Sequence, residues 1–107
     1  MQLTPTAVSL TADWDRGFNG GKSQIFYLSV NGEHQRTVED DPDGSGHYTV
    51  RLDEDDDIRA STTYIVSLYA RNEIGESDTL TKTTNTKGVY IDDLHDQITL
   101  LMLVYLI

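Results

Sequence analysis

The chain has 107 residues and no cysteine, so it is long enough for one domain with a single core, and it excludes disulfides and thiolate chemistry. Eight Lys and Arg residues against eighteen Asp and Glu residues give a formal net charge of −10. This balance argues against nucleic acid as a partner, because binding to phosphate backbones depends on Lys and Arg.

Two β-strands are predicted in the first third of the chain. From Val8 onward apolar residues alternate with polar ones, which is the period of two of a half-buried strand. Glycines then predict a loop over Asp15 to Lys22, followed by a strand over Ile25 to Val30 and a tight turn at Asn31-Gly32. The side chains expected on the buried faces of these strands are Val8, Leu10, Ala12, Trp14, Phe26, Leu28 and Val30.

The same pattern continues after a turn-rich segment from Glu39 to Gly46. Alternation resumes before the acidic run, and a long regular strand precedes a polar turn over Asn72 to Glu76 and a last strand over Thr79 to Thr86. The inward residues of the two middle strands are Tyr48, Val50, Leu52, Tyr64, Val66, Leu68 and Ala70. Short strands without a helical period between them predict an all-β, antiparallel sandwich.

One pattern in the second half of the chain is specific enough to suggest a family. A hydrophobic residue stands six positions before a tyrosine, and an alternating strand then leads into Ala-x-Asn-x-x-Gly-x-Ser. The residues that carry this pattern are Ile58, Thr62, Tyr64, Val66, Leu68, Ala70, Asn72, Gly75 and Ser77. Together with Trp14 and Tyr27 they resemble a fibronectin type III domain over residues 5–86, and the stretch "WDRGFNGG" is most similar to such domains in immunoglobulin-superfamily adhesion receptors of the nephrin kind.

The resemblance implies an immunoglobulin-like sandwich with Trp14 in the centre of its core. It also implies a tyrosine corner, in which the Tyr64 hydroxyl bonds to backbone near Ile58 and holds the crossover between the sheets. The core expected from pattern and resemblance comprises Trp14, Phe26, Leu28, Val30, Ile58, Tyr64, Val66, Leu68 and Ala70.

The sequence departs from the family in three places. Met1 to Thr6 is shorter than the family's first strand, so we expect that strand to be largely missing and the next one to be an exposed edge. Ile58 and Ala60 replace the Leu and Pro that are common before the corner tyrosine. The acidic run from Asp53 to Asp57 is not explained by the resemblance.

A near match to the phosphate-binding pattern G-x-x-x-x-G-K-S occurs in "RGFNGGKS". Gly21, Lys22 and Ser23 fit the pattern, but Arg16 stands at its first glycine. A strand follows where phosphate binding needs a helix N-terminus. The sequence therefore favours a plain loop over a nucleotide site.

Two acidic clusters, Glu39 to Asp43 and Asp53 to Asp57, could supply oxygen ligands for calcium. In the first cluster the residues at positions one, three, five and six of a calcium-binding loop are Glu39, Asp41, Asp43 and Gly44. Position twelve is Val50, where such a loop needs a bidentate glutamate. We expect the clusters to form a solvated acidic rim, with calcium as the alternative.

No residues are predicted to be catalytic, to bind a cofactor or to bind a metal. His34, His47 and His95 lack zinc-ligand spacing and are expected to be ordinary surface histidines. The G-x-S-x-G motif of a serine nucleophile does not occur in the sequence. The chain is therefore not expected to be an enzyme.

The chain divides into a sandwich at residues 1–86, a linker at 87–97 and an apolar tail at 98–107. The tail is shorter than the roughly 20 residues that a helix needs to span a bilayer. It is either the outer part of a transmembrane helix from an incomplete sequence, or a terminal segment that packs on the sandwich or is adventitious. Met1 to Pro5 lacks the regions of a signal peptide, so an extracellular protein would be incomplete at its N-terminus.

These observations favour a non-catalytic binding and spacer module, membrane-proximal in a cell-surface receptor, on the extracellular side of the plasma membrane. Loops such as Arg16 to Lys22 and Asn72 to Glu76 would contact a protein partner of unknown identity. The acidic surface would favour basic partners. The alternative is an accessory fibronectin type III module of a secreted multidomain enzyme.

Overall fold

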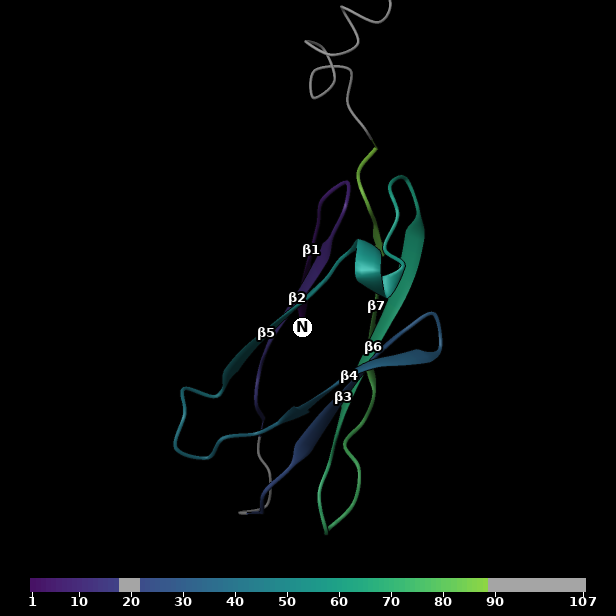
Figure 1. The fold of residues 1–107 in the computed structure, drawn as a ribbon. Coiled ribbons are helices and arrows are strands. Elements are labelled where there is room, and N and C mark those ends of the chain that lie inside the picture. Colours follow the sequence, from purple (N-terminus) through teal and green to yellow (C-terminus); the bar gives the residue numbers. More distant parts are fainter. Residues whose placement is uncertain (18–21, 89–107) are drawn as a thin grey trace, which may run out of the picture.

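The computed structural model describes residues 1–17 and 22–88. Two antiparallel sheets pack face to face, a three-stranded sheet in the order β1-β2-β5 and a four-stranded sheet in the order β4-β3-β6-β7 (Figure 1). The strands are β1 (Gln2–Pro5), β2 (Leu10–Asp15), β3 (Ile25–Val30), β4 (Glu33–Glu39), β5 (His47–Leu52), β6 (Thr63–Arg71) and β7 (Leu80–Asn85). The chain therefore folds as the antiparallel β-sandwich that the alternating pattern predicts.

The core lies between the sheets and follows the alternation of the strands. In β3 and in the first part of β6 every second side chain is buried, and the residues between them face outward. The buried cluster comprises Leu10, Ala12, Trp14, Phe26, Leu28, Val30, Leu52, Ile58, Tyr64, Val66 and Leu68. Ala70, also expected in the core, is partly buried and packs against this cluster, whereas Val8 is exposed.

The first strand is present, although it is short, and this corrects the expectation of an exposed second strand. All four residues of β1 pair with β2, from Gln2 opposite Asp13 to Pro5 opposite Leu10. Because β5 pairs with β2 on its other side, β2 is the central strand of its sheet and β1 is the edge.

The Asn31-Gly32 turn forms as the sequence predicts and starts a strand that the sequence did not reveal. Both residues have positive φ, 52° and 84°, as a two-residue hairpin turn with the right twist requires. The following strand β4 pairs with β3, with a register shift next to Leu28. β4 is polar and forms a sheet edge, so it carries little apolar alternation to predict it.

The acidic run after β5 forms a short 3-10 helix, Glu54–Asp56. Asp53 caps it, because its carboxylate accepts from the Asp55 N–H at 3.0 Å while its own N–H donates to the Asp56 carboxylate at 3.1 Å. Asp56 is also paired with Arg36 on β4 at 2.6 Å. The acids at the start of this helix are therefore structural as well as charged.

The tyrosine corner closes the end of the sandwich near this helix. The Tyr64 hydroxyl accepts from the Arg59 N–H at 2.8 Å and donates to the Asp57 carbonyl at 3.2 Å, on either side of Ile58. Nearby, the buried Thr86 hydroxyl donates to the Arg59 carbonyl. We call this region the tyrosine-corner end.

The described chain continues slightly past the proposed domain boundary at residue 86. The Lys87 N–H donates to the Thr6 carbonyl at 3.0 Å, and the Lys87 carbonyl accepts from the Ser61 N–H at 3.1 Å. Within residues 1–17 and 22–88 there is no helix long and apolar enough to cross a membrane. Most of the proposed linker and the whole apolar tail lie outside the described residues.

Candidate protein interaction surface

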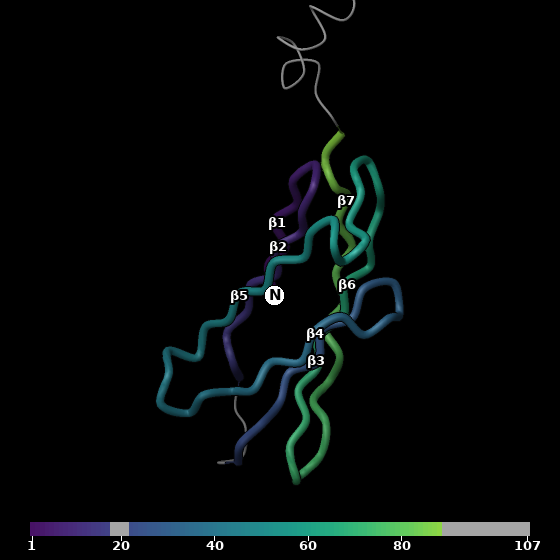
Figure 2. The backbone as a smooth tube through the Cα atoms, viewed as in Figure 1, coloured from purple at the N-terminus to yellow at the C-terminus, as the bar shows by residue number. Residues whose placement is uncertain are grey.

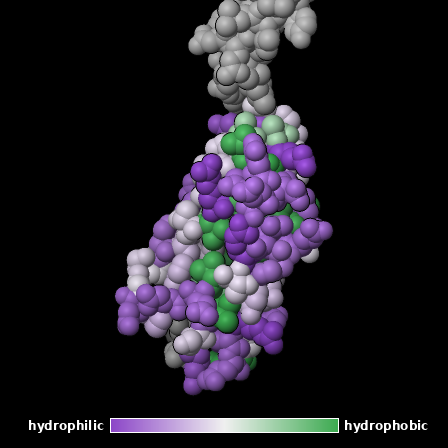
Figure 3. Space-filling view, viewed as in Figure 1, coloured by the Kyte–Doolittle hydropathy of each residue, from purple (hydrophilic) through white to green (hydrophobic). Residues whose placement is uncertain are grey.

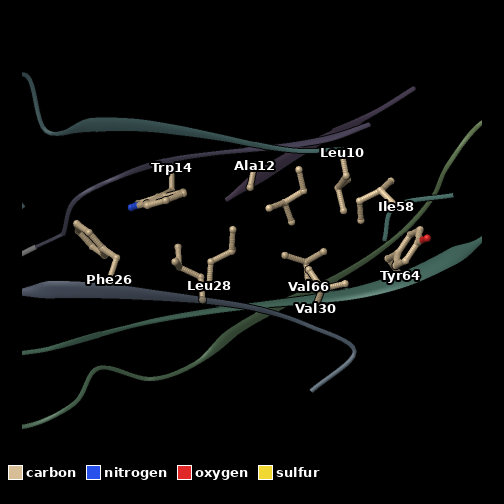
Figure 4. Packing of buried hydrophobic residues seen from close by; sticks show 11 residues of the cluster. Leu10, Ala12, Trp14, Phe26, Leu28, Val30, Ile58, Tyr64 and Val66 are labelled. Atoms are coloured by element: carbon tan, nitrogen blue, oxygen red, sulfur yellow. The ribbon is translucent and has the colours of Figure 1, made fainter. Parts of the chain in front are cut away.

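The opposite end of the sandwich carries Trp14 and the turns that follow β2, β4 and β6. Figure 4 shows Trp14 and Phe26 at one end of the core and Ile58 and Tyr64 at the other. The β4–β5 and β6–β7 connections lie toward the end of the molecule at which β2 ends and β3 begins (Figure 2). We call this region, with residues 15–17, 40–46 and 72–79, the loop end.

Arg16 organises the β4–β5 connection at the loop end. Its guanidinium donates from Nη1 to the Asp40 carboxylate at 3.2 Å and to the Asp41 carbonyl at 2.9 Å, and from Nη2 to the Gly44 carbonyl at 3.3 Å. Gly46 leaves room for this side chain, because a Cβ there would come within 3.0 Å of Arg16 Nε. The Arg16 side chain therefore holds the β4–β5 connection in place.

Asp40 is the buried centre of this arrangement, and only 1% of its side chain is exposed. Gln24 Nε2 donates to its second carboxylate oxygen at 3.0 Å, and the Tyr48 hydroxyl donates to the first. Burial favours a higher pKa for the Asp40 carboxyl, but the hydrogen bonds and the nearby guanidinium outweigh burial and lower the pKa. The charge of the buried Asp40 carboxylate is therefore balanced by Arg16, and both of its oxygens already accept hydrogen bonds.

Tyr48 connects this polar cluster to the aromatic part of the core. Its ring stacks on Trp14 at a centroid distance of 5.8 Å and lies 5.1 Å from Phe26. Burial raises the pKa of the Tyr48 hydroxyl, and the adjacent Asp40 carboxylate raises it further. The hydroxyl consequently stays protonated and continues to donate to Asp40.

The expectation of a solvated acidic rim holds for most acids of the two clusters, which are exposed, but not for Asp40 and Asp56. Asp40 is buried among donors, and the Asp56 side chain is only 11% exposed, so both acidic clusters have structural members. The proposed calcium-binding loop holds a guanidinium against its Asp41 and Gly44 carbonyls. A calcium ion at that position would have to compete with this fixed positive charge.

The β6–β7 turn explains why Asn, Gly and Ser occur at fixed spacing there. The Asn72 side chain accepts from the N–H groups of Ile74 and Gly75, at 2.9 and 3.2 Å. The Ser77 hydroxyl accepts from the Ala70 N–H at 2.8 Å, and the Ser77 N–H donates to the Ala70 carbonyl. The turn is therefore held by its own polar side chains.

A cleft of about 530 Å³ lies between these two organised connections. Its lining includes Ser23, Gln24, Ile25, Tyr27, Glu39, Asp40, Arg71, Asn72 and Glu73. Tyr27 stacks on Tyr69 at 5.0 Å on the outer face of the four-stranded sheet. Glu73 pairs with Lys22 at 2.9 Å, where both side chains are at least half exposed. We call this feature the acidic cleft.

Lys22 and Ser23, the end of the near match to a phosphate-binding loop, lead into strand β3. The Lys22 ammonium is paired with Glu73, and Gly21 lies outside the described residues. In the part of this loop that the structure describes, the lysine therefore has a carboxylate partner and there is no helix N-terminus for a phosphate.

His47 lies at the surface as the sequence predicts, but it is paired with two carboxylates. It lies across from Asp15 in the β2–β5 register, with its Nδ1 2.8 Å from the Asp15 carboxylate and its Nε2 3.4 Å from that of Asp13. These carboxylates raise the pKa of His47, the hydrogen bond to Asp15 most of all. His34 contacts the Thr37 hydroxyl at 2.9 Å, and His95 lies outside the described residues.

Sequence reasoning missed the Asp40 cluster and the His47 pair for the same reason. The partners are Arg16 with Asp40 and Asp15 with His47, which come from different strands or loops. Their meeting depends on strand register. The alternation of β2 and β5 could have placed Asp13, Asp15 and His47 on one outer face, had the two strands been aligned in advance.

Among the described residues, no group of three or more His, Cys, Asp or Glu side chains is arranged to hold a metal ion. The cluster with most polar contacts is built around Asp40, whose two oxygens are both occupied by donors. An occupied, buried carboxylate cannot reach a substrate proton.

No known family profile and no curated protein matches the chain. Among solved structures, a β-sandwich protein redesigned by computer is 16% identical, with a TM-score of 0.58 over 83% of this chain and 92% of that chain. The fibronectin type III domain of the human fibronectin type III domain containing protein 3 is 19% identical, with a TM-score of 0.43 over 79% of this chain and 78% of that chain. The first of these similarities places the chain in the β-sandwich fold.

Proposed function

We propose that this chain is a fibronectin type III-like domain that acts as a non-catalytic binding and spacer module in a cell-surface adhesion or signalling receptor. Its strand order, with four strands packed on three, supports the fibronectin type III part of the proposal. So does the Tyr64 hydroxyl, bonded to the backbone of Asp57 and Arg59. Such domains commonly bind other proteins or space them apart.

The observation that carries the binding function is the acidic cleft. Glu39 and Glu73 are exposed at its rim, and Tyr27 offers an aromatic surface within it. A Lys or Arg of a protein partner could pair with Glu39, lie against the tyrosine ring and replace Lys22 as the cation beside Glu73. The partner class is therefore a basic protein surface, which also complements the net charge of −10.

The course of β7 supports a membrane-proximal placement. β7 begins beside the β6–β7 turn at the loop end, and its last residue, Asn85, is opposite Thr63, close to the tyrosine corner. A membrane attachment through residues 98–107 would turn the tyrosine-corner end toward the bilayer. The acidic cleft would then face away from the plasma membrane, on the extracellular side, where a partner has access to it.

A binding experiment with charge-matched variants tests the proposal. The full chain, as an immobilised array, is offered a panel of purified extracellular domains that spans acidic to basic proteins. We expect binding by basic domains, with an affinity that falls as salt rises. The variant with Glu39→Gln and Glu73→Gln should bind them about tenfold more weakly, because it loses two attractive charges and releases Lys22 into the cleft.

The control variant, Glu33→Gln with Glu54→Gln, carries the same change in net charge at exposed positions away from the cleft. It should bind almost as well as the unchanged chain. Equal weakening of both variants would show that only overall charge matters and would remove the acidic cleft from the proposal. Binding that ignores salt and both substitutions would contradict the choice of a basic partner.

A further inference from the structure

A second opening lies on the side of the core between the start of β1 and the start of β7. It has a volume of about 310 Å³, and its lining includes Met1, Trp14, Phe26, Leu68, Ala70 and Leu80. Gln24 is the one described residue that lines both this opening and the acidic cleft. We call it the edge groove.

The edge groove exists because the two sheets do not cover each other fully. The pairing of β1 with β2 ends at Gln2 opposite Asp13, while β2 continues to Asp15. Leu80 of β7 is opposite Leu68 of β6 and shares its core-facing side. Leu68 is 4% exposed whereas Leu80 is 51% exposed, so the inner face of β7 is uncovered at this point.

A buried polar group also lacks a partner at the edge groove. Trp14 is 4% exposed, and within residues 1–17 and 22–88 its indole Nε1 is the only buried side-chain nitrogen or oxygen without a hydrogen bond. In Figure 4 this nitrogen points away from Ala12, toward the loop end of the core. An unsatisfied buried donor is unfavourable, so an occupant that offers a carbonyl oxygen would bind with an added gain.

The free edge of β7 determines the form of such an occupant. Among the described residues β7 pairs only with β6. Just past its far end the chain bonds to the first segment, where the Lys87 N–H donates to the Thr6 carbonyl, so it is the edge at the start of β7 that can accept a further strand. An extended peptide added there would direct alternate side chains into the groove, where an oxygen of one of these side chains would be the acceptor for Trp14. Asp78, which is exposed, and Asp15 lie at the groove and favour a basic residue beside the apolar ones.

We propose that the edge groove binds an extended peptide strand of a protein partner, with alternating apolar side chains flanked by basic residues, which pairs with β7 and accepts a hydrogen bond from Trp14. Three observations carry it: an uncovered apolar face, an unpaired indole N–H and acids at the rim. The proposal goes beyond the proposed function, because the edge groove and the acidic cleft can bind independently.

The single tryptophan of the chain allows a direct test in the full-length protein. The probe is a short synthetic peptide with lysine at each end and valine alternating with threonine between them. We expect the fluorescence of Trp14 to change on titration and to saturate. Leu80→Asn should weaken this binding about tenfold or more, because it removes the apolar contact in the groove.

Ile65→Asn is the matched control, because Ile65 is 48% exposed and faces the opposite side of the four-stranded sheet. It should leave the affinity unchanged, as should the Glu39→Gln and Glu73→Gln pair in the acidic cleft. A peptide with glutamate ends, and one with central N-methylated residues that cannot donate to β7, should both bind much more weakly.

Several results would overturn the proposal. These are an unchanged Trp14 signal, equal effects of Leu80→Asn and Ile65→Asn, or equal binding of the lysine-ended and glutamate-ended peptides. A fluorescence change that depends on the concentration of the chain alone, together with a dimer in sedimentation, would assign the groove to a second copy instead.

Discussion

Each end of the sandwich buries an aromatic residue that carries a polar group, but only one end supplies hydrogen-bond partners for that group. Tyr64 is 5% exposed, and its hydroxyl both accepts and donates a backbone hydrogen bond. Trp14 is 4% exposed, but its indole N–H has no partner among the described residues. The tyrosine-corner end thus satisfies its buried polar group with backbone partners, while the loop end buries a polar group without one.

The two acidic clusters also differ in whether their carboxylates are bonded within their own segment. Asp53 and Asp56 satisfy the backbone of their own short helix, which closes the tyrosine-corner end. At the loop end, Asp40 is neutralised by Arg16, which comes from a different part of the chain. Glu39 beside it remains exposed at the acidic cleft. In Figure 3, hydrophobic residues form a narrow seam between broad hydrophilic surfaces. The surface on this face of the sandwich is therefore mainly polar.

The largest effect is expected from Trp14→Ala, which removes the aromatic centre of the loop end. It should lower the free energy of unfolding by about 3 to 5 kcal/mol, as other large aromatic truncations in cores do. Chemical denaturation followed by circular dichroism measures this change. An unchanged midpoint would contradict the place of Trp14 in the core.

Arg16→Met should have the next largest effect, because it leaves the buried Asp40 carboxylate without its cation. We expect a loss of about 2 to 3 kcal/mol, since Gln24 and Tyr48 still donate to that carboxylate. The double variant with Asp40→Asn should recover part of the loss in a denaturation experiment. No recovery would mean that Arg16 acts through its contacts with Asp41 and Gly44.

Tyr64→Phe examines the closed end by removing one hydroxyl. The Arg59 N–H and the Asp57 carbonyl would each lose a partner, so we expect a cost of about 1 to 3 kcal/mol. Hydrogen exchange should show faster exchange at the Arg59 amide. A Tyr48→Phe variant, which changes a hydroxyl at the loop end, should leave that amide protected.

The smallest effect concerns His47, which is about half exposed. Because its pKa is raised in the folded state, its contribution to stability is present below the unfolded pKa of about 6.5 and is lost as pH rises through the folded pKa. His47→Gln should therefore reduce the fall in stability across this range. An identical pH dependence in the variant and the unchanged chain would argue against pairing with Asp15 and Asp13.

The sequence reveals the parts of the fold in which one local pattern decides the outcome. Alternation in β3 and β6 predicts the buried faces, and Asn31-Gly32 predicts a hairpin turn. The polar edge strand β4 has too little apolar alternation to be predicted, and β1 is held by pairing with β2 and not by its own pattern. Both strands depend on partners that lie elsewhere in the chain.

The candidate surfaces were harder to predict than the fold. Asp40 is one acid in a row of similar residues, and only the position of Arg16, on a different connection, separates a buried carboxylate from a solvated one. The acidic cleft needs Glu39 and Glu73 to be brought together by β4 and β6. The edge groove arises from a mismatch in strand length, which no single stretch of sequence records.

The most direct test of the difference between the two ends is hydrogen exchange of the Trp14 indole N–H, which gives one signal in an NMR spectrum because the chain has a single tryptophan. The reference is the Arg59 amide, which donates to Tyr64 at 2.8 Å. We predict that the indole N–H exchanges much faster than this amide and slows when the edge groove is occupied by the lysine-ended peptide. An indole N–H that is as well protected as the Arg59 amide without any ligand would contradict an open loop end.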